Sequence, residues 1–88
     1  MSTLRQFIIY YMKNEYILDK DNIRNIIKLL TGFEGKTLTR LKVDINHKYG
    51  KTDSLENLAN KLRNKTVKMS EIFEIFDILG YEILVRKK

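Results

Sequence analysis

Apolar residues recur three or four positions apart in four stretches of this sequence, which is the spacing of an α-helix with one buried face. The first stretch predicts a helix over 21–31 that Asp19 or Asp21 caps and that ends near Gly32 and Gly35. Its expected buried side consists of Ile23, Ile26, Ile27 and Leu30.

The second and third stretches predict two helices that a glycine separates. Over 39–49 we expect Thr39 to be the N-cap and Gly50 to form a left-handed turn at the C-terminal end. The next helix is expected to begin at Asp53, which has the spacing of a capping box to Glu56. The apolar positions of this helix are Leu55, Leu58 and Leu62.

The fourth stretch predicts the last helix over 70–79, with Gly80 as its stop. Alternation of apolar and polar residues over 81–86 then favours a short C-terminal strand. The N-terminal extension, residues 1–19, stays ambiguous because Thr3 to Leu18 fits both an amphipathic helix and a β-rich segment. If the N-terminal extension forms a strand, the predicted C-terminal strand could pair with it.

These elements predict one mainly α domain over 1–88 with four to five helices. Two helices joined by a short turn with a glycine, the second polar and basic on its outer side, predict a helix-turn-helix over 39–66. The helices at 21–31 and 70–79 would supply the core that this pair cannot bury alone.

The outer side of the helix in 53–66 is lined with asparagine. Asn57, Asn60 and Asn64 lie opposite the leucines, although asparagine is a poor residue for a helix interior. An asparagine amide can both donate to and accept from an adenine edge in the major groove of DNA. A second explanation stays open, because lysine, isoleucine and asparagine make up 30 of the 88 residues, and such a bias by itself places amides on the surface.

Positive charge is concentrated in the middle of the chain. Residues 36–68 contain nine basic and three acidic residues, so this segment carries the whole net charge of +6. Such a field attracts a polyanion and makes its binding dependent on salt. Double-stranded DNA is therefore the expected partner.

Two pieces of the sequence, KYGKTDSLENLANKLRNKT at 48–66 and SEIFEIFDILGYEI at 70–83, carry a resemblance to a known class. From Lys36 to Lys88 the chain resembles the lambda-repressor/Cro-like helix-turn-helix proteins, and within them short phage- or plasmid-type proteins of low-GC bacteria. The resemblance implies DNA binding, with the helix that bears Asn57, Asn60 and Lys61 in the groove. Two departures stand out: Lys42 occupies a position where repressors favour a small alanine, and Asn64 stands where relatives end this helix with a glycine.

Roles follow from residue type and position. Asn57 and Asn60 are expected to contact bases, whereas Asn64 is expected at the end of the helix. Arg40 could contact a phosphate from the start of its helix. The other expected phosphate contacts are Lys51, Thr52, Ser54, Lys61, Arg63 and Lys65, with Thr52 and Ser54 equally suited to cap a helix.

Other classes of function find little support in the sequence. The chain has no cysteine, and His47 is the single histidine, so neither a metal site nor a cofactor is expected. No nucleophile–base pair, acidic dyad or phosphate loop indicates an enzyme. No apolar run reaches the roughly 20 residues of a bilayer span, and a cytoplasmic protein is expected.

Two interactions with proteins stay open. The aromatic residues Phe7, Tyr10, Tyr11, Tyr16, Phe73 and Tyr81 exceed what one small core needs. They could form a homodimer contact, or the N-terminal element could fold over its own core. The alternative function is a protein-interaction module on a helix-turn-helix scaffold, such as a phage-encoded inhibitor of a host complex that binds nucleic acid.

Overall fold

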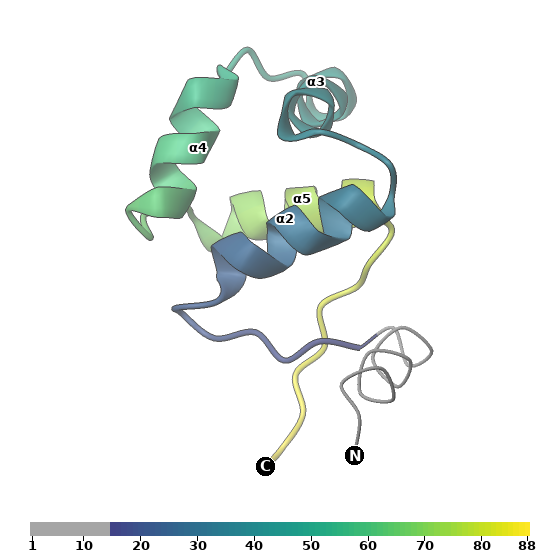
Figure 1. Cartoon of the computed structure of the whole chain (residues 1–88), viewed down its shortest axis with the longest axis vertical. Helices are drawn as coiled ribbons and strands as arrows, with labels where there is room; N and C mark the ends of the chain where they lie inside the picture. Colours follow the sequence, from purple (N-terminus) through teal and green to yellow (C-terminus); the bar gives the residue numbers. More distant parts are fainter. Residues whose placement is uncertain (1–14) are drawn as a thin grey trace.

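The computed structural model describes residues 15–88, and that part of the chain contains four helices and no strand (Figure 1). They are α2 (Ile23–Phe33), α3 (Leu38–Tyr49), α4 (Leu55–Arg63) and α5 (Met69–Leu79). Figure 1 views α3 nearly along its axis, whereas α2, α4 and α5 lie closer to the plane of the picture. The mainly α class expected from the sequence is confirmed.

The core lies where the apolar sides of the four helices meet. Helix α5 contacts both α2 and α3, and α4 contacts α2 and α3. Each helix contributes at least two buried apolar side chains, which are Ile27, Leu30, Leu41, Ile45, Leu58, Leu62, Ile72, Ile75, Phe76 and Leu79. The helical spacing of apolar residues therefore identified the buried sides correctly, because in a small domain every helix must bury one side against the others.

The N-caps differ from those expected. Helix α3 is capped by Thr37, whose Oγ1 accepts from the backbone N–H of Arg40 at 3.2 Å, so the assignment to Thr39 was wrong. Ser54 caps α4, because its Oγ accepts from the N–H of Asn57 at 3.1 Å, and the assignment to Asp53 was wrong. In both cases two residues with a suitable side-chain oxygen lie within two positions of each other, so the sequence alone does not decide which of them caps the helix.

The N-terminal ends of α2 and α5 also differ from those predicted from the sequence. Asn22 is the N-cap of α2, and Asp19 instead accepts from the backbone N–H groups of Asp21 and Asn22. Helix α5 begins at Met69, one residue earlier than predicted, and the N–H of Lys68 donates to Glu71 Oε1 at 3.1 Å. The side chain of Glu71 thus supplies an acceptor at this helix end.

Glycine ends both α3 and α5, as predicted; the left-handed turn was predicted for Gly50, and Gly80 has the same conformation. Gly50 has φ 64° and Gly80 has φ 83°. After α4, where the sequence has no glycine, Asn64 keeps φ −90° and Lys65 takes the left-handed conformation with φ 58°. A side chain in this region costs about 1–2 kcal/mol, so the turn after α4 carries strain that a glycine would relieve.

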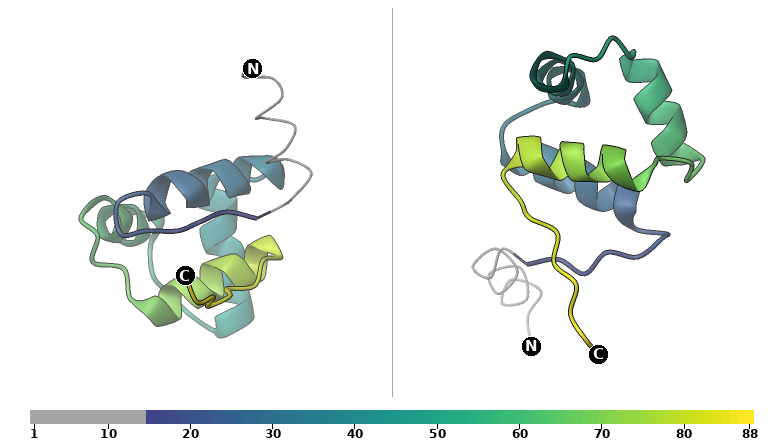
Figure 2. Two further views of the ribbon diagram at one scale, coloured as in Figure 1. Left: turned by 90° about the horizontal axis from the view of Figure 1, so that it is seen from below. Right: turned by 180° about the vertical axis from the view of Figure 1, so that it is seen from behind.

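The tail does not form the strand predicted over 81–86. Residues 81–88 have no regular secondary structure, and neither do residues 15–19, which pass beside them (Figure 2). The two segments meet where the rings of Tyr16 and Tyr81 touch edge to face, with centroids 6.3 Å apart. An aromatic contact holds the tail here, without a ladder of backbone hydrogen bonds. The prediction for Thr3 to Leu18 lies mostly outside the described residues.

Candidate nucleic-acid interface

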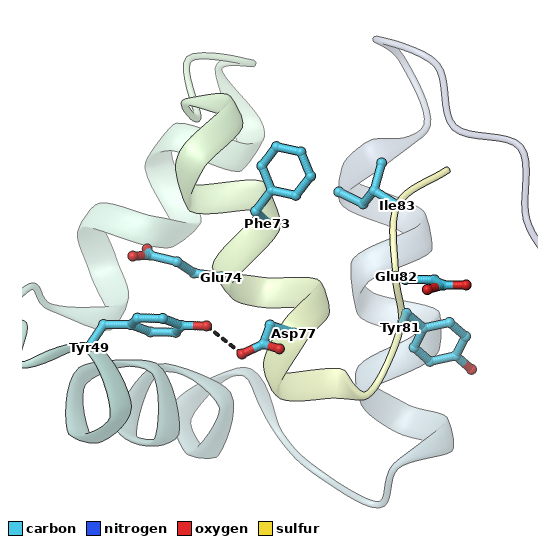
Figure 3. A pocket seen from close by; sticks show the side chains of 7 residues that line it. All are labelled: Tyr49, Phe73, Glu74, Asp77, Tyr81, Glu82 and Ile83. Carbon is cyan, nitrogen blue, oxygen red and sulfur yellow. Dashed lines mark hydrogen bonds between the residues drawn. The ribbon is translucent and has the colours of Figure 1, made fainter. Parts of the chain in front are cut away.

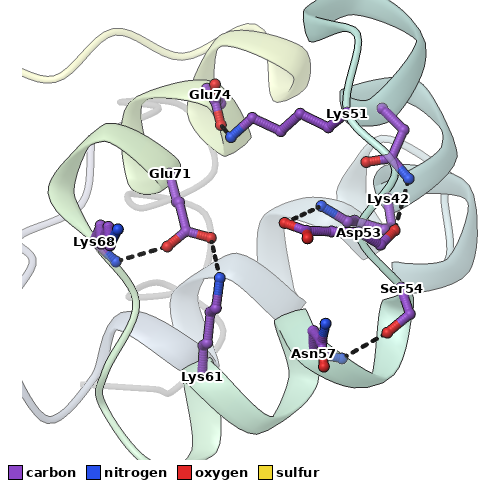
Figure 4. Close-up of polar contacts among 10 residues, drawn as sticks. Lys42, Lys51, Asp53, Ser54, Asn57, Lys61, Lys68, Glu71 and Glu74 are labelled. Atoms are coloured by element: carbon purple, nitrogen blue, oxygen red, sulfur yellow. Dashed lines mark hydrogen bonds and ion pairs between the residues drawn. The ribbon is translucent and has the colours of Figure 1, made fainter.

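Residues 50–54 connect α3 to α4 and are fastened to α3 by polar contacts. The side-chain amide of Asn46 donates to the backbone carbonyl of Asp53 at 2.8 Å. The carboxylate of Asp53 lies 3.7 Å from the ammonium of Lys42, whose side chain is only 7% exposed (Figure 4). Lys42, which departs from the small residue of the resembled class, is therefore a buried group that positions this connection and α4 after it.

Asn57 has an exposed side chain near the start of α4. Its backbone N–H is used by the cap at Ser54, but its side chain is exposed and makes no hydrogen bond within residues 15–88. It lies in the first turn of the helix. A free amide at this place can donate and accept at the same time.

Of the other two asparagines of the stripe, one is engaged by a neighbouring side chain and one lies at the end of the helix. Asn60 is half-buried, and its Oδ1 accepts a hydrogen bond from the guanidinium of Arg63. Asn64 is exposed and is the C-cap of α4, as its predicted role at the helix end requires. The three amides therefore have different surroundings, although the sequence places them on one side.

Two lysines predicted to contact phosphate are bound to carboxylates of α5 (Figure 4). Lys61 Nζ lies 2.9 Å from Glu71 Oε2, and Lys51 pairs with Glu74. The hydrogen bond to Glu71 raises the pKa of Lys61 above its usual value. Burial raises the pKa of Glu71, but the hydrogen bonds from Lys61 and from the N–H of Lys68 outweigh it and leave this pKa lowered.

The remaining predicted basic contacts divide into paired and unpaired side chains. Arg40 Nε lies 3.2 Å from Asp44, which also pairs with Lys36 at 3.0 Å. Lys65 pairs with Asp21 at 2.6 Å, and both of these side chains are more than half exposed. Within residues 15–88 Arg63 has no carboxylate partner; its guanidinium contacts Asn60.

The predicted concentration of positive charge in 36–68 is thus largely offset by folding. Seven of its nine basic residues form ion pairs, which are those of Lys36, Arg40, Lys42, Lys48, Lys51, Lys61 and Lys65. Four of the partner carboxylates lie outside that segment, at Asp21, Glu71, Glu74 and Asp77. The net charge of the segment did not reveal this neutralisation, because these four carboxylates lie ten or more positions from their lysines in the sequence.

Two pockets in the described part of the chain bear on ligand binding, and the larger of these two, of ≈ 490 Å³, has the wrong charge for a polyanion. It lies between the end of α3, α5 and the tail (Figure 3), and its lining residues are Tyr49, Phe73, Glu74, Asp77, Tyr81, Glu82 and Ile83. Lys48 and the hydroxyl of Tyr49 both donate to Asp77 and lower the pKa of that carboxyl. The sequence singled out Phe73 and Tyr81 as surplus aromatics, and both line this pocket.

No bilayer-spanning helix and no metal-ligating group of three side chains occurs in residues 15–88. None of the four helices combines the length and the apolar character that crossing a bilayer requires. In the same part of the chain, histidine, aspartate and glutamate side chains form no group of three that could hold a metal ion.

The pieces of sequence that resemble the lambda-repressor/Cro-like class fall on neighbouring parts of the fold. Residues 48–66 span the end of α3, the connection and α4, and residues 70–83 span α5 and the start of the tail. In comparisons with known proteins, no family model matches the chain, and no curated protein or solved structure matches it either.

Proposed function

We propose that this protein binds double-stranded DNA in a sequence-dependent manner, with α4 in the major groove. The observation that carries the proposal is the free amide of Asn57 in the first turn of α4. In helix-turn-helix proteins the N-terminal residues of the second helix contact base edges. The resemblance of residues 36–88 to repressors supports the role of a small cytoplasmic transcriptional regulator of phage or plasmid type.

The fastening of the 50–54 connection supports the same use of α4. A helix that reads bases must be held rigidly, because an amide recognises a base edge only at hydrogen-bond distance. Asn46 and Lys42 hold Asp53 from α3, while Lys51 and Lys61 tie the connection and α4 to α5. In this proposal several predicted phosphate contacts serve first to position the helix.

The experiment begins by selecting bound duplexes from a random pool. Asn57→Ala is then compared with the unchanged protein on the selected duplex and on a shuffled duplex. We expect the preference between them to fall by about 1–3 kcal/mol, or roughly 5- to 150-fold. Asn64→Ala is the matched control, since the same side chain is removed at the far end of α4.

Two results would count against base contact by Asn57. One is a random pool from which no sequence is enriched at low salt. The other is an Asn57→Ala variant that loses affinity equally on both duplexes, which would indicate a phosphate contact.

Two copies of the chain on one duplex are part of the proposal. A dimer would place two α4 helices on half-sites one helical turn apart, roughly 34 Å, and so combine two weak contacts. Sedimentation equilibrium with and without the selected duplex measures the stoichiometry. One copy bound to a single unrepeated site would overturn this part.

A second candidate function is contact with a protein at the larger pocket. Phe73 is 51% exposed there beside the carboxylates of Glu74, Asp77 and Glu82, so an apolar and cationic surface would fit it. A gel shift at low and high salt discriminates between the two functions. Absence of any shift at low salt favours the protein contact, and a shift that salt weakens favours DNA.

A further inference from the structure

A second group of cations surrounds the smaller pocket, of ≈ 170 Å³, between the start of α2 and the end of α4. Lys20, Arg24, Arg63 and Lys65 line it, together with one carboxylate, that of Asp21. Four positive charges against one negative charge leave an excess of three. The sequence did not reveal this group, because Lys20 and Arg24 lie about 40 positions before Arg63 and Lys65.

These cations are less neutralised than those beside α5. Within residues 15–88 Lys20, Arg24 and Arg63 have no ion pair, and the Lys65–Asp21 pair is exposed on both sides. Solvent screens an exposed pair, so it contributes little and a competing anion can take the place of its carboxylate. A phosphate can therefore replace Asp21 at Lys65, whereas at Lys61 it must displace a carboxylate that is only 12% exposed.

One further carboxylate lies at this end of α2, that of Asp19, and it accepts from the backbone N–H groups of Asp21 and Asn22. The first turn of α2 contains no acidic residue. Asn22 directs its side chain away from the helix, since its Oδ1 accepts from the N–H of Asp19 and its Nδ2 donates to the carbonyl of Ile17. The positive end of the helix dipole thus adds to the field of the four cations.

We propose that this pocket binds phosphates of the DNA backbone, so that the contact extends from α4 onto the first turn of α2. The inference rests on the proposed function, because DNA held by α4 is its ligand. Arg63 and Lys65 stand where α4 ends, and Lys20 and Arg24 continue the same cationic surface. The salt dependence of binding would then come mainly from this pocket, and less from Lys51 and Lys61.

The test compares two double variants with equal loss of charge. Lys20→Ala with Arg24→Ala removes one lysine and one arginine from the pocket. Both side chains are exposed, as are those of Arg86 and Lys87, which the control variant changes. Arg86→Ala with Lys87→Ala removes the same two types from the tail. The slope of log affinity against log salt on duplex DNA should flatten by roughly two for the pocket variant and stay unchanged for the tail variant.

Each outcome has a separate meaning. If the unchanged protein binds duplex and the pocket variant has the same slope, the pocket is overturned and DNA binding stands. Equal flattening in both variants would show an effect of net charge alone and would also overturn the pocket. If the unchanged protein does not bind duplex at low salt, the proposed function falls, and the pocket's role falls with it.

Discussion

Lys61 of α4 donates to Glu71 of α5 across 2.9 Å, and Glu71 in turn accepts from the N–H of Lys68 at the start of α5. One carboxylate therefore joins the proposed DNA-binding helix to the first turn of the helix that follows it. The same ammonium cannot also neutralise a phosphate at full strength. In the proposed complex, Glu71 would compete with DNA for Lys61.

This competition predicts a gain in DNA binding for Glu71→Gln. Glutamine keeps an oxygen for the N–H of Lys68 but releases the charge of Lys61, so the salt slope should steepen by about one. Fluorescence anisotropy on duplex at several salt concentrations measures it. Glu34→Gln, at the C-terminal end of α2, removes the same charge elsewhere, and an equal gain there would refute a specific role of Glu71.

The ion pair between the buried Lys42 and Asp53 predicts that neutralising one partner lowers the free energy of unfolding more than neutralising the other. Asp53→Asn leaves a buried ammonium without its carboxylate, which is unfavourable, whereas Lys42→Met replaces the ammonium with an apolar group of similar length. We expect Asp53→Asn to lower the free energy of unfolding more than Lys42→Met does. Urea denaturation followed by circular dichroism measures both, and the reverse order would contradict this account of the connection.

Two glycines predict opposite responses to alanine. Gly50 has φ 64°, so Gly50→Ala should destabilise the protein by about 1–2 kcal/mol. Gly32 lies inside α2, and a Cβ there meets nothing within 4 Å, so Gly32→Ala should stabilise by roughly 0.5–1 kcal/mol. Thermal unfolding of both variants is the measurement, and changes of the same sign would show that the left-handed turn does not matter.

Three lowered carboxyl pKa values predict a loss of stability in acid. The hydrogen bond from Lys48 lowers the pKa of Asp77, and the hydrogen bond from Lys36 lowers that of Asp44. Burial raises the pKa of Glu71, but its two hydrogen bonds outweigh burial and leave this pKa lowered. A depressed folded-state pKa stabilises the fold above the unfolded value. These contributions should be complete above the unfolded-state pKa values of 3.8 for aspartate and 4.5 for glutamate, and disappear as pH falls through the lower folded-state pKa values.

Urea denaturation between pH 7 and pH 2 measures this dependence. Asp77→Asn should reduce the loss between neutral and acid pH, because it removes one of the three linked groups. An unchanged pH profile in that variant would show that the Lys48–Asp77 pair does not persist in solution.

The sequence alone determined the helices and their buried sides. The leucines of α4 and the isoleucines of α2 and α5 repeat at the helical period, and local spacing suffices to place them. The left-handed turn at Gly50 and the helix stop at Gly80 were also readable, since glycine adopts the left-handed conformation without a penalty. The caps were misplaced by one or two residues because neighbouring side chains offer equivalent oxygens.

The tertiary structure alone decided which charges and amides remain available to a ligand. Asn57 and Asn60 look alike in the sequence, yet only Asn57 keeps its side-chain amide free, because Arg63 donates to Asn60. Lys61 and Arg24 look alike as cations, yet Glu71 pairs with Lys61, while Arg24 has no carboxylate partner among residues 15–88. Ion pairs form between side chains that folding brings within a few ångströms, so a distribution of charge along the chain does not determine the field at its surface.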